Sequence, residues 1–480
     1  MLLPPAPDDC RRLLDWFSET GYTFAGLTGR NLTERASRRY GTVKYLLEQT
    51  EEPSAFHMLA RWFTIGVSVS AAQARATLPA WAIDLLAASG VLRAVNGDLE
   101  PTVMFSPLGT MLVASDPVLK WEDDPADLVL WPNPTTEQLF NFTIRKPFGS
   151  ALDLGCGCGV QALGAATHCG SVTATDLSAR AAEFTVFNAR LNGIENVECA
   201  AGDGFDPVRG RRFDLIVANP PFFITPSSGL SYCENSLGLD LFCRRLAREA
   251  ADHLNEQGFF QMVCEWVEIE GEPWRNRIAE WMEGSGCDAW AIKQYSMTPS
   301  KYGSERAHQR PPGGEHEFFA EWIAYARANR IAAVHGGVIS MRKRSGKNWL
   351  RIDEEPISLK AAVGDVVLGA FSARDVLDVE AGLMRLRPRL AADARLVQLM
   401  GASDGQWSRQ SLRLHLTGAM PRQIDIDPAV AQFIAQFDGK RRLDELIQAL
   451  AERVNAPAQQ VAGESIAVVR KLLAEGYIEV

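Results

Sequence analysis

Short apolar runs alternate with helical segments across the middle of the chain, from Ala151 to about Arg344. The runs are residues 151–154, 172–175, 197–200, 215–218, 259–264, 289–292 and 337–341. Runs of this kind, separated by helical segments, are typical of buried strands in a parallel sheet. The pattern therefore predicts an α/β fold, with a mainly parallel sheet and helices on both of its faces.

The N-terminal part has a different pattern, which is mostly helical up to about residue 115. A helix predicted from Pro79 is followed by an apolar stretch at 90–92, a polar turn at 96–98 and a second apolar stretch at 103–105. Helix, strand, turn and strand is the outline of a winged helix. Prolines and acidic residues then mark a connector, and Thr135 or Thr136 is expected to cap the helix that follows.

The C-terminal part is less regular at first. Alternating stretches at 366–368 and 412–416 suggest strands, and from Pro428 the pattern is helical again. The last helix ends at Gly476, before a short strand at 477–480, which predicts a second, winged-helix-like module. We therefore divide the chain into a helical or winged-helix module (1–120), the α/β domain (121–345) and a C-terminal module (346–480).

Composition narrows the class of protein. The chain has 480 residues, of which 46% are hydrophobic and 22% charged, and this fits about two to four globular domains. The net charge of -10 argues against loose binding to nucleic acid or anionic membranes. The basic cluster at 342–347 is interpreted as a solvated loop.

Nine cysteines without a CxxC pair are interpreted as reduced thiols, and no metal site is expected. Because neither a signal peptide nor a long apolar run occurs, we expect a cytoplasmic protein.

A glycine loop follows the first strand of the α/β domain, in the segment Asp153-Leu154-Gly155-Cys156-Gly157-Cys158-Gly159. Glycines allow the backbone to turn tightly and to approach a ligand closely. A pyrophosphate would favour bare amides at this point, whereas Asp153 suits a ligand that carries an ammonium and a sulfonium group. Gly155, Cys156, Gly157 and Gly159 are therefore candidate cofactor residues.

Acidic residues follow the next two strands. Asp176, with Leu177 beside it, ends the second strand and is placed to hold two ribose hydroxyls. Asp203, followed by Gly204, comes after the third strand and suits an adenine amino group. Taken alone, either aspartate could be a helix cap. Three acids at three neighbouring strand ends, together with the glycine loop, favour a cofactor site.

The fourth strand runs directly into Asn219-Pro220-Pro221-Phe222. The two prolines end the strand and restrict the backbone. The Asn219 side-chain oxygen and a rigid backbone carbonyl can accept both hydrogens of an NH₂ group, which would direct the nitrogen lone pair at a methyl sulfonium. Phe222 offers a flat face for stacking on an amide or a base. These four residues are the candidate catalytic residues.

The glycine loop, Asp176, Asp203 and the Asn-Pro-Pro-Phe motif resemble the motifs of class I S-adenosyl-L-methionine-dependent methyltransferases. Within them they resemble the amino-methylating branch of glutamine, adenine-N6 and ribosomal RNA guanine-N2 methyltransferases. The resemblance covers roughly residues 125–345, and the three-part layout resembles actinobacterial-type proteins known only as methyltransferases. It implies a Rossmann-like, seven-stranded sheet, with S-adenosyl-L-methionine as the cofactor. In glutamine methyltransferases the fourth motif residue is usually Tyr, whereas Phe222 is more usual in the RNA enzymes. Thr135 and Glu137 lie where glutamine methyltransferases have a cofactor lid, so we expect them near the site.

Three functional hypotheses follow. The favoured one is N-methylation of a macromolecule, either a nucleobase of RNA or DNA, which requires nucleic acid binding, or a protein glutamine. The second is a tailoring methyltransferase for a small molecule or short peptide. Oxygen methylation is disfavoured because it usually needs a general-base histidine, and none closely follows the fourth strand. The third is a non-catalytic binding protein, against which the intact acids and glycines argue. No membrane partner is expected, and the sequence does not define the oligomeric state.

Overall fold

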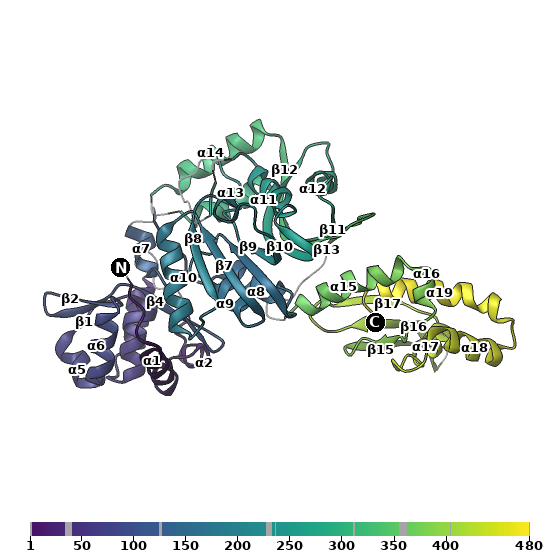
Figure 1. Cartoon of the computed structure of the whole chain (residues 1–480), viewed down its shortest axis with the longest axis horizontal. Coiled ribbons are helices and arrows are strands. Elements are labelled where there is room, and N and C mark those ends of the chain that lie inside the picture. The colour runs from purple at the N-terminus through teal and green to yellow at the C-terminus, as the bar shows by residue number, and fades with distance from the viewer. Residues whose placement is uncertain are drawn as a thin grey trace. The chain divides into compact units, whose positions relative to one another are not determined.

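The computed structural model describes residues 2–33, 41–123, 127–226, 233–235, 237–310, 313–354, 362–403 and 405–479. The chain divides into two compact units, residues 1–140 with 146–354 and residues 141–145 with 355–480, and we describe each by itself (Figure 1). The boundary expected after residue 120 lies inside the first unit. No helix of the described residues is long and apolar enough to cross a membrane.

An eight-stranded sheet forms the centre of the first unit, with the order β13-β11-β12-β10-β9-β6-β7-β8. Its strands are β6 (Phe148–Leu154), β7 (Cys169–Asp176), β8 (Val197–Ala201), β9 (Phe213–Ala218), β10 (Leu254–Ile269), β11 (Cys287–Met297), β12 (Ile331–Lys343) and β13 (Leu350–Glu354). Neighbours from β8 to β10 are parallel, whereas β12 is antiparallel to both of its neighbours. All seven predicted apolar runs lie in strands. The expected count of seven was one short, because β13 adds an eighth strand beside β11.

Helices connect these strands. They are α9 (Val160–Ala166), α10 (Ala179–Leu191), α11 (Leu241–Ala250), α12 (Trp274–Met282), α13 (Pro299–Ala307) and α14 (Glu315–Ala328), with a short 3₁₀ turn η2 (Asp206–Val208). A further helix, α8 (Pro134–Phe142), precedes β6. From β6 the chain crosses over to β7 and β8 in one direction, and from β9 it crosses to β10 in the other. Right-handed crossovers therefore place α9 and α10 on one face of the sheet and α11 on the other. The carboxyl ends of β6 and β9 meet where the direction changes.

The N-terminal part of this unit is helical with two small sheets. Its helices are α1 (Pro7–Glu19), α2 (Phe24–Thr28), α3 (Thr42–Glu48), α4 (Ala55–Ala60), the π-helical turn η1 (Arg61–Ile65), α5 (Ala71–Thr77), α6 (Ala80–Ala88) and α7 (Val118–Asp123). Its strands are β1 (Val69–Ser70), β2 (Leu92–Val95), β3 (Asp98–Pro101), β4 (Met104–Leu108) and β5 (Met111–Ser115). The hairpin from β2 to β3 turns at Asn96 and Gly97, whose φ angles of 51° and 92° fit a tight two-residue turn. Residues 103–105, expected to be its second strand, instead lie in and just before β4, which pairs with β5. The assignment as a winged helix stays a prediction.

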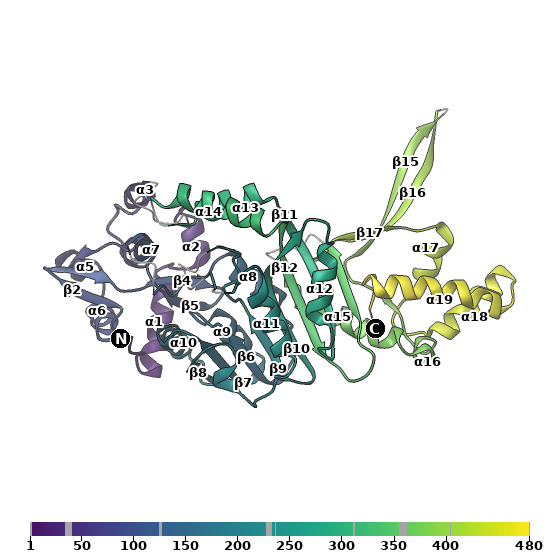
Figure 2. The same cartoon turned by 90° about the horizontal axis from the view of Figure 1, so that it is seen from above.

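The second unit contains the C-terminal helices and a long hairpin. Its elements are α15 (Gly364–Leu377), α16 (Glu380–Leu383), β14 (Arg389–Leu390), β15 (Ala394–Ser403), β16 (Gln406–Leu416), β17 (Arg422–Asp425), α17 (Pro428–Ile434), α18 (Leu443–Val454), α19 (Ala458–Ala474) and β18 (Ile478–Glu479). Figure 2 shows the β15–β16 hairpin extending away from α18 and α19. The predicted strand at 366–368 is wrong. Those residues lie in α15, because Val363, Val367 and Phe371 are buried at helical spacing.

The basic cluster at 342–347 also differs from its interpretation as a solvated loop. Arg342 lies in β12, is 4% exposed, and its guanidinium is 2.8 Å from the buried carboxylate of Asp288. Arg344 lies 3.5 Å from the same carboxylate. Part of this cluster is therefore structural, because a buried charge needs a partner of opposite sign.

Candidate functional site

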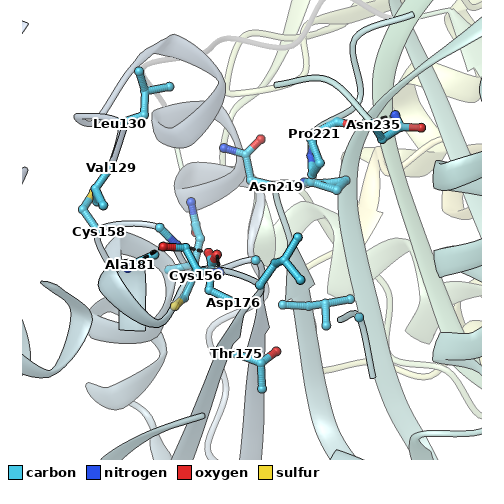
Figure 3. A pocket seen from close by; sticks show the side chains of 18 of the residues that line it. Val129, Leu130, Cys156, Cys158, Thr175, Asp176, Ala181, Asn219, Pro221 and Asn235 are labelled. Carbon is cyan, nitrogen blue, oxygen red and sulfur yellow. Dashed lines mark hydrogen bonds between the residues drawn. The ribbon is translucent and has the colours of Figure 1, made fainter. Parts of the chain in front are cut away.

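A cavity of about 670 Å³ lies at the carboxyl ends of β6, β7, β8 and β9 (Figure 3). Among the predicted site residues, those that line it are Gly155, Cys156, Gly157, Asp176, Leu177, Asp203, Gly204, Asn219, Pro220 and Pro221. Asp153, Gly159 and Phe222 are not among its lining residues. The fold thus brings together residues that are separated by more than 60 positions along the chain.

Backbone N–H groups of the glycine loop donate hydrogen bonds to residues at the end of β7. The N–H groups of Gly155 and Cys156 donate to the Thr175 carbonyl at 2.8 and 2.9 Å, and the Gly157 N–H donates to Oδ2 of Asp176 at 2.9 Å. Gly155 and Gly157 have φ angles of +76° and +54°, and a Cβ added at either would meet no atom within 4 Å. These two positions therefore face open space, where a ligand can approach the backbone.

Asp153 and Gly159 support this loop from within the fold. Asp153 is 1% exposed, and its Oδ2 accepts the Ala162 N–H at 2.8 Å at the start of α9. Burial raises the pKa of Asp153 to about 7, although the Ala162 hydrogen bond partly opposes this shift. Gly159 has a φ of +86°, and a Cβ there would lie 2.8 Å from Thr185. Both residues shape the loop without lining the cavity.

The two strand-end aspartates have different surroundings. Asp176 accepts backbone N–H groups from Gly157 and, at 2.9 Å, from Ser178, while burial raises its pKa. Ser178, and not Asp176, caps α10. The Asp203 side chain is 58% exposed and lies 3.3 Å from the Arg245 guanidinium. Arg245, on α11, also lines the cavity, and no sequence motif had indicated it.

Asn219 follows β9 directly, and Asn219, Pro221 and Asn235 line the same side of the site (Figure 3). None of the described residues hydrogen-bonds to the Asn219 amide, whereas Asn235 Nδ2 donates to the Pro221 carbonyl at 2.8 Å. The Asn219 amide is therefore available to a ligand in the cavity. Phe222 is 7% exposed, and its ring packs edge-on against the ring of Phe223, with 5.4 Å between the ring centroids.

A buried polar network supports the residues that follow this motif. The Ile224 N–H donates to the Tyr302 hydroxyl at 2.9 Å, and that hydroxyl donates to Oε2 of Glu265 at 2.6 Å. Glu265 also accepts from Tyr295 at 2.7 Å and from Arg306, whose guanidinium lies 3.6 Å from the Phe223 ring centroid. No sequence pattern indicates this network, because its members lie on β10, β11 and α13.

The segment before α8 borders the cavity as well. Residues 127–131, Asn133 and Thr136 line it, but Thr135 and Glu137, which were expected near the site, do not. The helix is capped by Asn133, not by a threonine, because Asn133 Oδ1 accepts the N–H groups of Thr135 and Thr136 at 3.0 Å each. The Thr135 hydroxyl donates a hydrogen bond to the same oxygen at 2.6 Å.

The lining fits S-adenosyl-L-methionine in size and charge. Cofactor sites typically have volumes of roughly 300–1,000 Å³, and this cavity lies within that range. Four of its lining residues are acidic, namely Asp127, Asp176, Asp203 and Glu234. Arg180, Arg245 and Arg310 pair with Asp127, Asp203 and Glu234 respectively. Asp176 has no cationic partner among the described residues and accepts only backbone N–H groups. Such a lining favours a ligand with cationic groups and ribose hydroxyls. No cluster of three or more potential metal-binding His, Cys, Asp or Glu side chains occurs in the part of the chain that the structure describes.

Comparisons with known proteins agree with this geometry. Residues 134–268 match the family model described as methyltransferase small domain. The chain is 40% identical over 110 residues to a release factor glutamine methyltransferase of Bordetella pertussis, covering 22% of this chain and 40% of that protein. It is 36% identical over 118 residues to a ribosomal RNA small subunit methyltransferase C of Salmonella paratyphi B, covering 24% and 31%. The chain thus spans two fifths or less of the length of these relatives.

Among solved structures, a methyltransferase from Pyrococcus furiosus matches with 22% identity and a TM-score of 0.28, covering 45% of this chain and 85% of that chain. The matched segment contains β6 to β9, nearly all of β10 and most of the residues that line the cavity at the switch point. That segment is therefore a methyltransferase domain of the class I, Rossmann-like fold, an enzyme domain whose cofactor is S-adenosyl-L-methionine.

Proposed function

We propose that the chain is an S-adenosyl-L-methionine-dependent N-methyltransferase that acts on a planar amino or amide nitrogen of a macromolecule. The observation that carries this proposal is the Asn219 amide, which lines the cavity without a partner among the described residues. The relatives named above methylate, by their names, ribosomal RNA or release-factor glutamine. Glutamine carries an NH₂ group on a planar amide, and adenine, guanine and cytosine in RNA carry one on a conjugated ring.

Asn219 and the prolines would orient that NH₂ group. The Asn219 side-chain oxygen and the Pro220 carbonyl can each accept one of its two hydrogens. Asn235 holds the neighbouring Pro221 carbonyl at 2.8 Å, which restricts the backbone at this point. Holding the nitrogen in one orientation removes much of the entropic barrier to an in-line displacement.

The bound cofactor supplies an electrophilic methyl group. The glycine loop, Asp176 and Asp203 would hold it at the carboxyl ends of the strands. A nitrogen held by Asn219 would accept this methyl group and would give up one of its two protons. The positive charge that develops on the nitrogen is then stabilised by the Asn219 oxygen and the Pro220 carbonyl.

The test uses radiolabelled methyl donor and extract from cells that lack the protein. Wild type is compared with Asn219→Ala and with Asn329→Ala, a matched control at the end of α14. We expect Asn219→Ala to reduce methyl transfer about 100-fold or more, with the control unchanged. Label released by nuclease identifies a nucleobase, and label released only by protease identifies a protein. Equal labelling by Asn219→Ala and wild type would contradict the proposal. Label found only in small molecules would contradict its macromolecular part.

A further inference from the structure

One side of the cavity is formed by residues that precede the methyltransferase core. Residues 127–131, here called the outer wall, all line the cavity. Figure 3 shows Val129 and Leu130 on the side of the cavity away from Pro221 and Asn235. A ligand bound between the glycine loop and Asn219 would therefore be covered by this wall, and its entry and release would depend on how firmly the wall is held.

The wall is held by the carboxylate of Asp116, which is 1% exposed. Oδ2 of Asp116 accepts the Val129 N–H at 2.8 Å, and the Asp116 N–H donates to the Val129 carbonyl at 3.0 Å. Lys120 lies 3.2 Å from the same carboxylate. The wall is thus bound through its own backbone to one buried, charged side chain.

Arg180 of α10 binds both Asp116 and the wall. Its guanidinium donates to Oδ2 of Asp116 at 2.6 Å and also to Oδ1, and it donates to the Asp127 carbonyl at 2.9 Å. A guanidinium that binds both oxygens of a carboxylate is held in one orientation, because its donors form a rigid plane. Arg180 lies four residues beyond Asp176, at the start of the helix that borders the cavity.

A second contact joins the N-terminal part to the glycine loop through the same helix. Asn188 of α10 accepts the Ala114 N–H at 2.8 Å and donates to the Ala114 carbonyl at 2.8 Å and to the Cys158 carbonyl at 2.9 Å. Asn192 makes the same pair of bonds to Leu112, each at 2.9 Å. Strand β5, which leads into Asp116, is therefore bound to α10 along most of its length.

We propose that Asp116 and Arg180 are positioning residues that hold the outer wall closed over the cofactor, so that the N-terminal part of the chain controls cofactor release. This inference rests on the proposed function, because it assumes that S-adenosyl-L-methionine occupies the cavity. Neither residue lines the cavity, so the pair acts through the wall.

The test measures cofactor dissociation by stopped-flow fluorescence, with S-adenosylhomocysteine as the probe and the full chain as the protein. Arg180→Lys keeps the charge but cannot bind both Asp116 oxygens and the Asp127 carbonyl in the same geometry. We expect its dissociation rate to rise roughly tenfold, which corresponds to about 1.4 kcal/mol. Arg190→Lys, an exposed arginine on the same helix, is the matched control and should leave the rate unchanged.

Two further readouts separate positioning from a general loss of structure. With saturating cofactor the turnover of Arg180→Lys should stay within about twofold of wild type, while its KM for the cofactor rises. Leu130→Ala leaves the Asp116–Arg180 pair intact and removes only part of the wall, and it should also speed dissociation. A dissociation rate of Arg180→Lys equal to that of wild type would overturn the inference, even if Leu130→Ala speeds dissociation. Failure of wild type to bind the probe would instead overturn the assumed cofactor site.

Discussion

Replacing Asp153 with asparagine isolates the electrostatic effect of a carboxylate buried under the cofactor loop. Burial raises the pKa of Asp153 from 3.8 to about 7, so the folded protein retains a proton that the unfolded chain releases near pH 4. A pKa shift of this size corresponds to a contribution of about 4 kcal/mol to the free energy of unfolding. The folded-state pKa is the higher one. The stability contribution is therefore complete below pH 4 and is lost as the pH rises through 7. Asparagine removes this titration, and its oxygen can still accept the Ala162 N–H.

The expected difference can be measured in a narrow window of pH. Between pH 5 and pH 8, proton linkage predicts that wild type loses about 2–3 kcal/mol of unfolding free energy relative to Asp153→Asn. Urea unfolding followed by tryptophan fluorescence reports on the correct part of the chain, because eleven of the twelve tryptophans belong to the first unit. The control is Asp206→Asn, which removes a carboxylate that is 63% exposed.

The result that would refute this reasoning is a constant difference between wild type and Asp153→Asn across the window. Such a result would mean that the folded protein does not protonate Asp153 near neutral pH. A pH-dependent difference of the same size for Asp206→Asn would also refute it, because the effect would then not depend on burial.

Two other predictions concern the glycine loop and the support of the Asn-Pro-Pro-Phe segment. Gly155→Ala should weaken cofactor binding measured by calorimetry, because the added Cβ enters the open space of the cavity. It should also lower the free energy of unfolding by about 1–2 kcal/mol, because residue 155 has a positive φ. Gly159→Ala should cost roughly 2–4 kcal/mol in thermal unfolding, because its Cβ also collides with Thr185; equal stability of the two variants would contradict this assignment. Tyr302→Phe leaves the Ile224 N–H and a Glu265 oxygen without a partner, so we expect about 1–3 kcal/mol of destabilisation and slower turnover at unchanged cofactor KM. Tyr325→Phe, which removes a similar bond to the Leu239 N–H, is its control, and equal turnover of the two variants would argue against a positioning role for Tyr302.

Sequence patterns predicted the central strands of the α/β domain well. Each run of apolar residues between 151 and 341 lies in a strand of one sheet, because a strand buried on both faces must be apolar at successive positions. At 366–368, in contrast, a short apolar run belongs to a helix and not to a strand. Three residues do not distinguish a strand from the buried face of a helix, and only the spacing of Val363, Val367 and Phe371 does so.

The candidate site was partly predictable for the same reason. Glycines, prolines and strand-end acids impose local conformations, so local sequence is enough to place the glycine loop, Asp176, Asp203 and Asn219 at one edge of a sheet. The depth of each residue could not be predicted. Asp153 lies within one apolar run and Asp176 directly follows the next, and Asp153 is buried beneath the loop whereas Asp176 lines the cavity.

What the sequence determined by itself is therefore the chemistry at the strand ends, since that chemistry depends on residues that are neighbours along the chain. The tertiary structure alone decided which distant residues complete the site. Arg180 reaches Asp116 across 64 positions, and Tyr302 reaches Ile224 across 78. Such pairs leave no periodic signal in the sequence, because they arise only when packing of the sheet, α10 and α13 brings buried polar groups together and each must find a partner.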